Sequence, residues 1–481
     1  MKYALVSVSD ATGFIPVARG LTKAGYTIIA TTGTGKILRK NRILFTPVET
    51  FTGTPALFGG RVKTLHPRLL GGILFHRTKH KREAHERAIP PIDLVIVNLY
   101  PFAEKPTIEN IDIGGVTLLR AAAKNYDAVT VVSDPDDYQH VIKEIKKKGN
   151  TSLQTRKTLA AKAFSLTASY DAKIARVLST VAELRYGENP HQQGWFYQKK
   201  GWNLLQGKPL SYCNIIDADA AWSLASDVQK PTAVCIKHAT PCGVASHKNI
   251  SEAFQHAYDA DPLSAFGVVI GLSRLCPPSI IQRIVDQKIF VEVIIAPGFE
   301  RRALMLLKER PNIRAIKMQN VERTIQNVER NRSALGGMLV QTSNTHILTK
   351  KDLQCVTKKK PTPAELIDLL FAWYVVKHTL SNAIVFAKNQ TTLGIGSGQT
   401  SRIDAVSIAT LKAKRSGKEL AGAVMASDAF FPFPDSVNAA ADLGITAIIQ
   451  PGGSKRDEEV IAEANARGIA MVFTGVRAFR H

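Results

Sequence analysis

The chain has no apolar run that approaches the roughly 20 residues needed to cross a bilayer. Met1 and Lys2 lead directly into an apolar segment, Tyr3–Val8, without a basic region or a small-residue cleavage site, so we expect a first strand and not a signal peptide. The five cysteines are odd in number and form no C-x-x-C pair, which indicates neither a disulfide framework nor a thiolate zinc site. These absences predict a cytoplasmic protein with no membrane partner.

Acidic residues are scarce relative to basic ones. The chain has 40 Asp and Glu against 63 Lys and Arg, which gives a formal net charge of +23. Such a charge attracts anions, either nucleic acid or phosphorylated small molecules. The basic runs at 79–82, 146–148 and 358–360 contain no interleaved aromatic residues for base stacking. We therefore expect solvated basic faces, small-molecule substrates and no nucleic-acid partner.

The length of 481 residues, 45% of them hydrophobic, predicts a globular chain of two or three domains. Up to about residue 150, helical patterns alternate with β-branched runs, which predicts a parallel sheet with helices on both faces. The predicted strands are Tyr3–Val8, Tyr26–Ala30, Asp93–Asn98 and Ala128–Val132. A helical run from Ser152 to Val181 then ends before Glu183–Pro190. We predict one domain over residues 1–177 and another over 178–481.

The second domain contains a faint internal repeat. In the first copy a strand ends on Lys237-His238 and is followed by Ser264–Phe266 and Val293–Gly298. In the second copy the matching segments are Asn382–Lys388, Asp428–Phe430 and Ala447–Gly452. Matched segments in the same order predict a duplicated α/β unit, roughly 178–350 and 351–481, whose halves face one another across a cleft. Chance similarity between short segments is the alternative.

Two segments of the first domain have the composition of an anion-binding site. Alternation places Arg61 and Lys63 on one side of an extended segment beside Thr64, which suits a phosphate or an oxyanion. A basic surface loop would have the same composition. Thr31–Thr34 follows a strand and opens a helix, so its backbone N–H groups can hold an anion. The G-x-x-x-x-G-K-[ST] spacing of a P-loop is absent.

A further helix is predicted to begin after Asp112, and Thr117, Arg120 and Lys124 fall on one stripe of it. A cation on such a stripe is usually solvated. Asp112 and Lys124 could also form an acid/base pair.

In the second domain an apolar run that begins at Thr232 ends on Lys237-His238. Ligands of open α/β sheets bind beyond the carboxyl ends of strands, where an imidazole can move protons near neutral pH. A solvated strand-end charge is the commoner explanation. The run Gly394–Gly398 lacks the third glycine of a dinucleotide-binding motif. Phe430–Phe433 could be core, or an apolar floor for a flat heterocycle.

A series of short segments, in order from Ser7 to the end of the chain, matches the motifs of one known family. They are Ser7–Asp10, Gly60–Pro67, Asn98–Phe102, Ile111–Gly115, Ala121–Asn125, Leu184–Gly187, Lys237-His238, Ser264–Gly267, Gly394–Arg402 and Ser427–Phe433. In these segments the chain resembles the bifunctional enzymes that join an aminoimidazole carboxamide ribonucleotide (AICAR) formyltransferase to an IMP cyclohydrolase. The resemblance implies an α/β fold: an N-terminal methylglyoxal-synthase-like parallel-sheet domain, followed by two cytidine-deaminase-like α/β halves.

The resemblance also implies three groups of site residues and no metal. The catalytic residues would be Lys237, His238, Lys63, Tyr100, Asp112 and Lys124. The cyclohydrolase substrate would contact Ser9, Thr31, Thr32, Gly33, Thr34, Arg61, Thr64, Asn98 and Gly114. The transferase substrate and the folate would contact Arg185, Tyr186, Phe266, Gly267, Glu292, Asn382, Arg402, Ile403, Phe430, Pro432, Asp435, Ser454, Lys455 and Arg477.

The implied chemistry has two steps. A formyl group moves from 10-formyltetrahydrofolate to AICAR, and the resulting formyl-AICAR closes to IMP with loss of water. His238 would take a proton from the weakly nucleophilic 5-amino group, and Lys237 would stabilise the oxyanion or protonate the departing folate nitrogen. Lys63 would hold the oxygen that leaves as water, while Asp112 and Lys124 move protons. The family builds its transferase site across a dimer interface, which implies a homodimer.

The chain departs from the family pattern at a few positions. Ala11 stands where a lysine is usual, Thr32 where a glycine is usual, and Val268 where bacterial members have a second glycine. The connection between Val181 and Arg185 is also short. Two alternatives remain. A zinc nucleobase deaminase needs H-x-E and P-C-x-x-C, and Ala245 replaces the last cysteine. A basic RNA-binding protein without turnover is the other.

Overall fold

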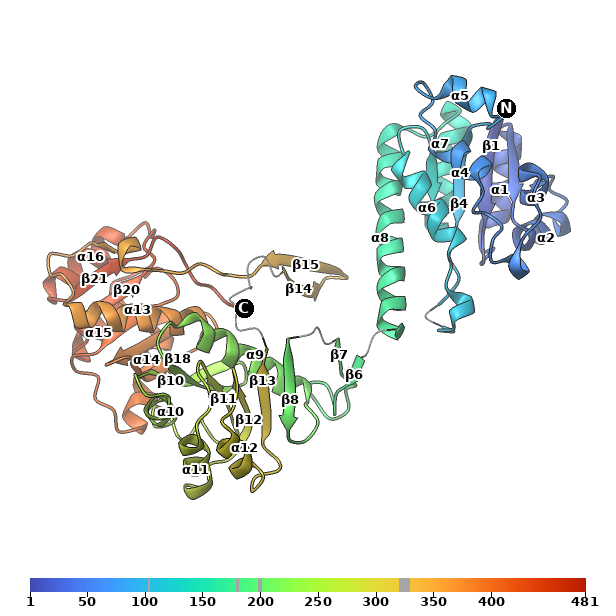
Figure 1. The fold of residues 1–481 in the computed structure, drawn as a ribbon. Helices are drawn as coiled ribbons and strands as arrows, with labels where there is room; N and C mark the ends of the chain where they lie inside the picture. Colours follow the sequence, from blue (N-terminus) through green and yellow to red (C-terminus); the bar gives the residue numbers. More distant parts are fainter. Residues whose placement is uncertain (103, 179–180, 198–200, 320–328) are drawn as a thin grey trace. The chain divides into compact units, whose positions relative to one another are not determined.

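The computed structural model describes residues 1–102, 104–178, 181–197, 201–319 and 329–481 (Figure 1). The chain divides into two compact units, Met1–Val181 and Ala182–His481. None of the helices in the described ranges has the length and apolar character that a membrane span requires.

The first unit is a five-stranded parallel sheet with the strand order β3-β2-β1-β4-β5. The four predicted strands are confirmed within two residues at either end, and a short edge strand joins them. The strands are β1 (Lys2–Ser7), β2 (Tyr26–Ala30), β3 (Thr46–Pro47), β4 (Ile92–Val97) and β5 (Thr130–Val132). The helices are α1 (Phe14–Lys23), α2 (Thr32–Lys40), α3 (Val48–Thr52), α4 (Pro67–Leu74), α5 (Lys81–Glu86), α6 (Gly114–Lys124), α7 (Tyr138–Lys148) and α8 (Leu153–Leu178).

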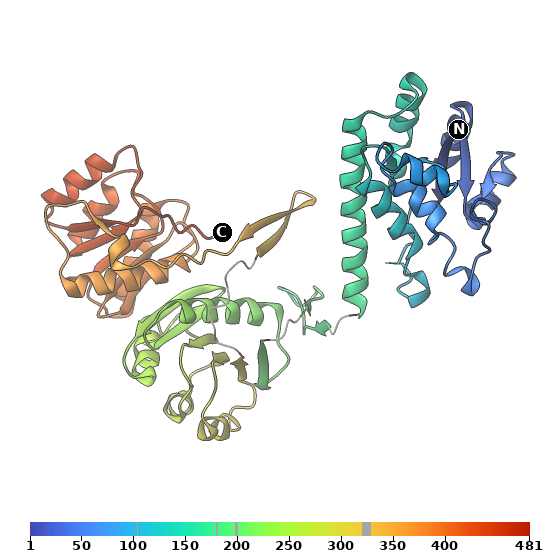
Figure 2. The same cartoon turned by 45° about the horizontal axis from the view of Figure 1, so that its top comes forward.

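The middle strands of this sheet are buried on both faces, which is why they read as continuous apolar runs. Leu5, Ile29 and Val95 are fully buried in one core with residues of α1, α6 and α7. The long helix α8 runs beside α6 in both views (Figures 1 and 2). Because all five strands are parallel, the loops after β1, β2, β4 and β5 meet at one edge of the sheet.

The second unit contains a 12-stranded sheet with the order β16-β21-β20-β19-β17-β18-β10-β9-β11-β12-β13-β8. Its strands are β8 (Trp202–Gln206), β9 (Thr232–Lys237), β10 (Thr240–Ser246), β11 (Val268–Leu272), β12 (Val291–Ala296), β13 (Arg314–Met318), β16 (Gln354–Cys355), β17 (Ile384–Lys388), β18 (Thr391–Gly396), β19 (Val424–Ser427), β20 (Ala447–Gln450) and β21 (Ala470–Phe473). Two small ribbons lie outside it, β6 (Val181–Glu183) with β7 (Trp195–Tyr197) and β14 (Glu329–Ala334) with β15 (Gly337–Thr342).

Two copies of one element order make up this sheet. Each copy runs helix, β-hairpin, helix and then three strands separated by helices. The first copy has helices α9 (Tyr212–Asp227), α10 (Ile250–Tyr258), α11 (Pro278–Asp286) and α12 (Arg301–Leu307). The second has α13 (Pro363–Lys377), α14 (Arg402–Arg415), α15 (Asp435–Asp442) and α16 (Asp457–Ala466). Residues of α9 and α13 share one core on one face, and each copy has a separate core with its remaining helices.

The structure differs from the sequence prediction in how the copies match and meet. Ser264–Phe266 precedes β11, whereas Asp428–Phe430 follows β19, so these two segments are not equivalent. The copies also join edge to edge and do not face one another, because β10 pairs with β18 in antiparallel orientation at Ala245 and Thr391. A pair of short similar segments cannot reveal this, since the pairing depends on strand order and not on local sequence.

The strand directions bring most of the predicted transferase residues to one edge of the 12-stranded sheet. β9 ends at this edge while β11 and β12 begin there, because β9 is antiparallel to β11. In the second copy β17 begins at this edge while β19, β20 and β21 end there. The predicted strand end at Lys237 is confirmed, because β9 ends at this edge. The edge is mixed, since the amino ends of β11 and β12 lie beside the carboxyl end of β9.

Candidate functional site

The end of β2 and the first turn of α2 contain the residues that the sequence predicts to bind an anion. Thr34 is fully buried, and its Oγ1 accepts a hydrogen bond from the Val8 N–H at 2.9 Å. The Thr31 Oγ1 lies 3.3 Å from the Ser7 Oγ. These hydroxyls hold the end of β2 against the end of β1. The N–H groups in the first turn of a helix have no partner within the helix, and such groups can hold an anion. The Thr32 hydroxyl, in place of a glycine, donates to the Glu49 Oε1 at 2.9 Å.

Asn98, directly after β4, braces the loop after β1. Its Oδ1 accepts from the Ser9 N–H at 2.5 Å and from the Asp10 N–H at 3.1 Å. Its Nδ2 donates to the Asp10 carbonyl at 2.8 Å. The Ser9 Oγ also donates to the Leu99 carbonyl at 2.9 Å. Asn98 and Ser9 thus shape this edge of the sheet through bonds to each other.

Lys63, Tyr100 and Asp112 come together from three different segments. The Lys63 Nζ donates to the Tyr100 Oη at 3.3 Å. The Asp112 carboxylate accepts from the Gly115 N–H at 2.6 Å at the start of α6. Burial raises the pKa of Asp112, while N–H donors from Gly115 and Tyr100 and the charge of Lys63 oppose that shift. A cation and a carboxyl group of raised pKa are suited to proton transfer.

Gly114 shows how closely this site is packed. A Cβ at Gly114 would lie 2.3 Å from the Oγ1 of Thr64, which is 2% exposed. Arg61, in contrast, is exposed and forms an ion pair with Glu109.

Lys124 does not join this group within one copy of the chain. It is exposed in the last turn of α6, whereas Asp112 precedes the first turn. At 1.5 Å per residue the two are separated by about 18 Å along the helix axis. The predicted direct acid/base pair of Asp112 with Lys124 is therefore wrong. Thr117, Arg120 and Lys124 do lie on one helix, but Lys124 is at the end of α6 that is far from Asp112.

Lys237 is anchored at the edge of the second sheet. Its Nζ donates to the Phe266 carbonyl at 2.6 Å and to the Gly267 carbonyl at 3.3 Å. Gly267 has φ +71°, and a Cβ there would lie 3.0 Å from the Lys237 Nζ. The Phe266 side chain is 69% exposed and its ring centroid lies 5.1 Å from that of Phe290. The ammonium group is thus fixed beside an exposed aromatic surface.

His238 is exposed on the two-residue turn that joins β9 to β10. Its neighbour Ala239 donates its N–H to the Oδ1 of Asp217 at 2.6 Å. Asp217 lies on α9 and is 9% exposed. Burial raises the pKa of Asp217, and the charges of His238 and Lys237 are among the influences that lower it. Sequence analysis missed Asp217, although a matching aspartate, Asp368, occupies the same place in the second copy.

Two further predicted side chains of the first copy have partners. The Glu292 carboxylate accepts from the Nη1 of Arg314 at 2.6 Å, and the Arg314 side chain is only 3% exposed. Arg314 was also missed, since nothing in its sequence context indicates that its guanidinium is buried. The Arg185 Nη2 donates to the Tyr186 Oη at 2.5 Å, with the guanidinium carbon 4.6 Å from the ring centroid.

Asn382 and Arg402 form a buried network in the second copy. The Arg402 Nη2 donates to the Asn382 Oδ1 at 2.8 Å, and its Nη1 donates to the Ser427 Oγ at 2.7 Å and to the Asp428 Oδ1 at 2.5 Å. Arg402 is 8% exposed and Asp428 is fully buried. Arg402 therefore holds Asn382 in place from within the fold, where sequence analysis predicted a direct substrate contact.

The remaining predicted residues lie around the ends of β19, β20 and β21. Ile403 packs partly buried against the core, whereas Phe430, Pro432, Asp435, Lys455 and Arg477 are exposed. The Ser454 Oγ accepts from the Arg456 N–H at 3.2 Å. The Arg477 guanidinium stacks 4.8 Å from the ring centroid of Phe479. The structure thus presents both cations and an aromatic surface at this edge.

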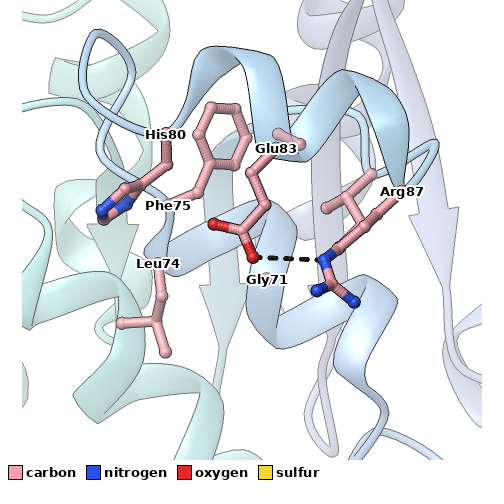
Figure 3. Close-up of a pocket in the computed structure, with 8 residues that line it drawn as sticks. Gly71, Leu74, Phe75, His80, Glu83 and Arg87 are labelled. Carbon is pink, nitrogen blue, oxygen red and sulfur yellow. Dashed lines mark hydrogen bonds and ion pairs between the residues drawn. The ribbon is translucent and has the colours of Figure 1, made fainter.

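One hollow of the first unit lies away from its predicted site residues. It measures about 280 Å³ between α4 and α5, and its lining includes Leu74, Phe75 and His80 (Figure 3). Glu83 and Arg87 form an exposed ion pair across its rim. None of the predicted site residues lines it. In the described part of the chain, no three His, Cys, Asp or Glu side chains are grouped as a metal ion would require.

Comparisons with known proteins agree along the whole chain. The family described as "AICARFT/IMPCHase bienzyme" matches residues 122–412, and the "MGS-like domain" matches residues 13–128. Proteins named "Bifunctional purine biosynthesis protein PurH" are 46% identical in Acetivibrio thermocellus, 46% in Caldicellulosiruptor saccharolyticus and 44% in Bacillus subtilis, each over 100% of this chain and 100% of the relative. A solved structure titled "Crystal structure of ForH" is 37% identical, covers 37% of this chain and 96% of that chain, and has a TM-score of 0.35. The full-length identity shows that this chain belongs to the AICARFT/IMPCHase family of bifunctional purine biosynthesis proteins.

Proposed function

We infer that this chain catalyses the last two steps of de novo IMP synthesis. A folate-type donor gives its formyl group to AICAR, and formyl-AICAR then closes to IMP with loss of water. Identity of 44–46% over whole relatives of the same family supports both activities. Nothing in the comparisons favours the RNA-binding alternative. The single observation that carries the site assignment is the fixed Lys237 ammonium next to the exposed His238 turn.

In formyl transfer, His238 takes the proton that the 5-amino group of AICAR loses as its nitrogen bonds to the formyl carbon. Two of the three N–H donors of Lys237 are used on the Phe266 and Gly267 carbonyls. The third can bond the oxyanion of the tetrahedral intermediate. Collapse of that intermediate breaks the bond to the folate nitrogen, which accepts a proton. The fixed ammonium group stabilises charge that develops only during the reaction.

We propose that the donor is 10-formyltetrahydrofolate and that its flat ring lies against the exposed aromatic side chains Phe266 and Phe430, which are 69% and 39% exposed. The exposed cations Arg185, Lys455 and Arg477 suit the phosphate of AICAR and the carboxylates of the folate. A homodimer, the cytoplasmic location and the cytidine-deaminase-like character of each sheet copy remain our proposals. The repeated element order supports the last of these.

In ring closure, the phosphate of formyl-AICAR binds at the first turn of α2 and its formyl group lies near Lys63. Closure is intramolecular, so the site has mainly to orient the carboxamide nitrogen against the formyl carbon. Lys63, bonded to the Tyr100 hydroxyl, holds the oxygen that leaves as water, and Asp112 exchanges the proton. Lys124 has no role in this step within one copy of the chain, because it lies at the far end of α6.

The test supplies AICAR and 10-formyltetrahydrofolate to the purified full chain and follows tetrahydrofolate and IMP. We expect both products. His238→Ala should abolish tetrahydrofolate release and still convert added formyl-AICAR to IMP, whereas Lys63→Ala should do the reverse. Absence of both products from the unsubstituted protein would contradict the proposed function.

A further inference from the structure

We propose that Asp217 is a positioning residue for formyl transfer. From α9 its carboxylate holds the His238–Ala239 turn in the conformation that presents the imidazole beside Lys237. The inference rests on the proposed function of that turn.

The turn is too short and too strained to keep its shape unaided. Lys237 pairs with Thr240, so only His238 and Ala239 connect the strands. Their φ angles are +52° and +56°, the left-handed pattern of a type I′ turn. Glycine, asparagine and aspartate usually occupy these positions, because other L-residues are strained at positive φ and this strain has a cost in stability. Some contact outside the hairpin has to offset this cost.

Asp217 supplies that contact from beneath the turn. Its Oδ1 accepts the Ala239 N–H at 2.6 Å, and the neighbouring N–H of His238 helps to lower the pKa of the same carboxyl group. At 9% exposure the carboxylate is nearly sealed from water, so the turn N–H groups have few alternative acceptors. The side chains of Lys237 and His238 lie close enough to this carboxylate to influence its pKa. The position of the imidazole thus depends on one buried acceptor.

The second copy contains the same contact between an aspartate and a hairpin turn, but its turn has no catalytic side chain. Asp368 on α13 accepts the Asn389 N–H at 2.8 Å and the Gln390 N–H at 2.7 Å. Asn389 and Gln390 have φ angles of +52° and +53°, and each aspartate lies 21 residues before the first residue of its turn. No side chain of this second turn titrates. Asp368 is therefore a matched control for the structural part of the role of Asp217.

The experiment compares Asp217→Ala with Asp368→Ala in the full chain. Both variants should lower the melting temperature, because each removes the acceptor of the turn N–H groups that bond to its carboxylate. Only Asp217→Ala should lower kcat for formyl transfer, by about 100-fold, since a displacement near 1 Å is enough for such a loss. KM for AICAR and for the donor should stay within about twofold, because the turn backbone is not part of either binding contact.

A third variant and a second measurement keep the outcomes distinct. Asp217→Asn keeps one acceptor oxygen and should recover about tenfold of the lost kcat. All variants should close added formyl-AICAR at the unsubstituted rate, which shows that the first unit is unaffected, and a cooperative melting transition of the second unit shows that it is folded. Equal kcat for Asp217→Ala and Asp368→Ala would overturn the proposal. If the unsubstituted chain transfers no formyl group, the proposed function is wrong. Amide hydrogen exchange at residues 236–242 then still tests whether Asp217 holds the turn, and unchanged exchange in Asp217→Ala would show that it does not.

Discussion

Arg402 offers the sharpest test of how the second site is supported. Its guanidinium bonds to Asn382, Ser427 and the fully buried carboxylate of Asp428. Arg402→Met keeps much of the side-chain volume and leaves that carboxylate without its counterion. Removing one partner of a buried pair costs about 3–5 kcal/mol, because the remaining charge stays buried. We expect a destabilisation of this size and a loss of formyl transfer, since Asn382 loses its support.

The assay is calorimetric melting of the full chain, read at the transition of the second unit. Since 1 kcal/mol moves Tm by about 2 °C in a domain of this size, the expected fall is about 6–10 °C. Asp428→Asn in the same background should restore part of it, because the two substitutions are coupled. The matched control is Arg415→Met, which removes an exposed arginine at the other end of α14 and should cost at most about 1 kcal/mol. Equal effects of Arg402→Met and Arg415→Met would refute the reasoning.

Three further outcomes follow from single contacts. Gly114→Ala should lower kcat of ring closure about tenfold or more, measured on added formyl-AICAR, because its Cβ would lie 2.3 Å from the Thr64 Oγ1 and must displace it. Formyl transfer by the same variant should be unchanged, and equal loss of both would indicate a folding defect. Burial lowers the pKa of His378, which bonds to Asp227 at 2.8 Å. As the pH falls, the unfolded chain therefore binds a proton at His378 at a higher pH than the folded chain does. The contribution of neutral His378 to the free energy of unfolding is present above pH 6.5 and is lost as the pH falls through the folded pKa. Urea midpoints at pH 7.5, 6 and 5 should fall more steeply for the unsubstituted chain than for His378→Gln, and parallel slopes would contradict this. Asp227→Asn should lower the free energy of unfolding at neutral pH, because His378 and Lys377 hold the pKa of Asp227 below 3.8. The difference from the unsubstituted chain should shrink below pH 3.8, and a difference that does not change with pH would count against the ion pair.

The local sequence pattern was sufficient to predict features that depend on a single strand or helix. The apolar runs of the first unit predicted its parallel strands within two residues, because burial on both faces leaves a clear signal. Motif order predicted the family. The same local reasoning placed Asp112 and Lys124 together, since it considered the face of the helix and not its length.

The local sequence pattern could not predict which side chains contact the site residues. Asp217, Arg314 and Asp428 lie 21 to 26 residues from His238, Glu292 and Arg402 in the sequence, and the packing of separate helices and strands makes them neighbours. The motifs, the parallel strands of the first unit and the family all follow from the amino-acid sequence. The edge-to-edge pairing of the two copies, the burial of Arg402 and the aspartate under each hairpin turn depend on how the chain folds. Long-range pairing produces these features, and the free energy of burying a charge or an N–H group is set by neighbours that are distant in sequence.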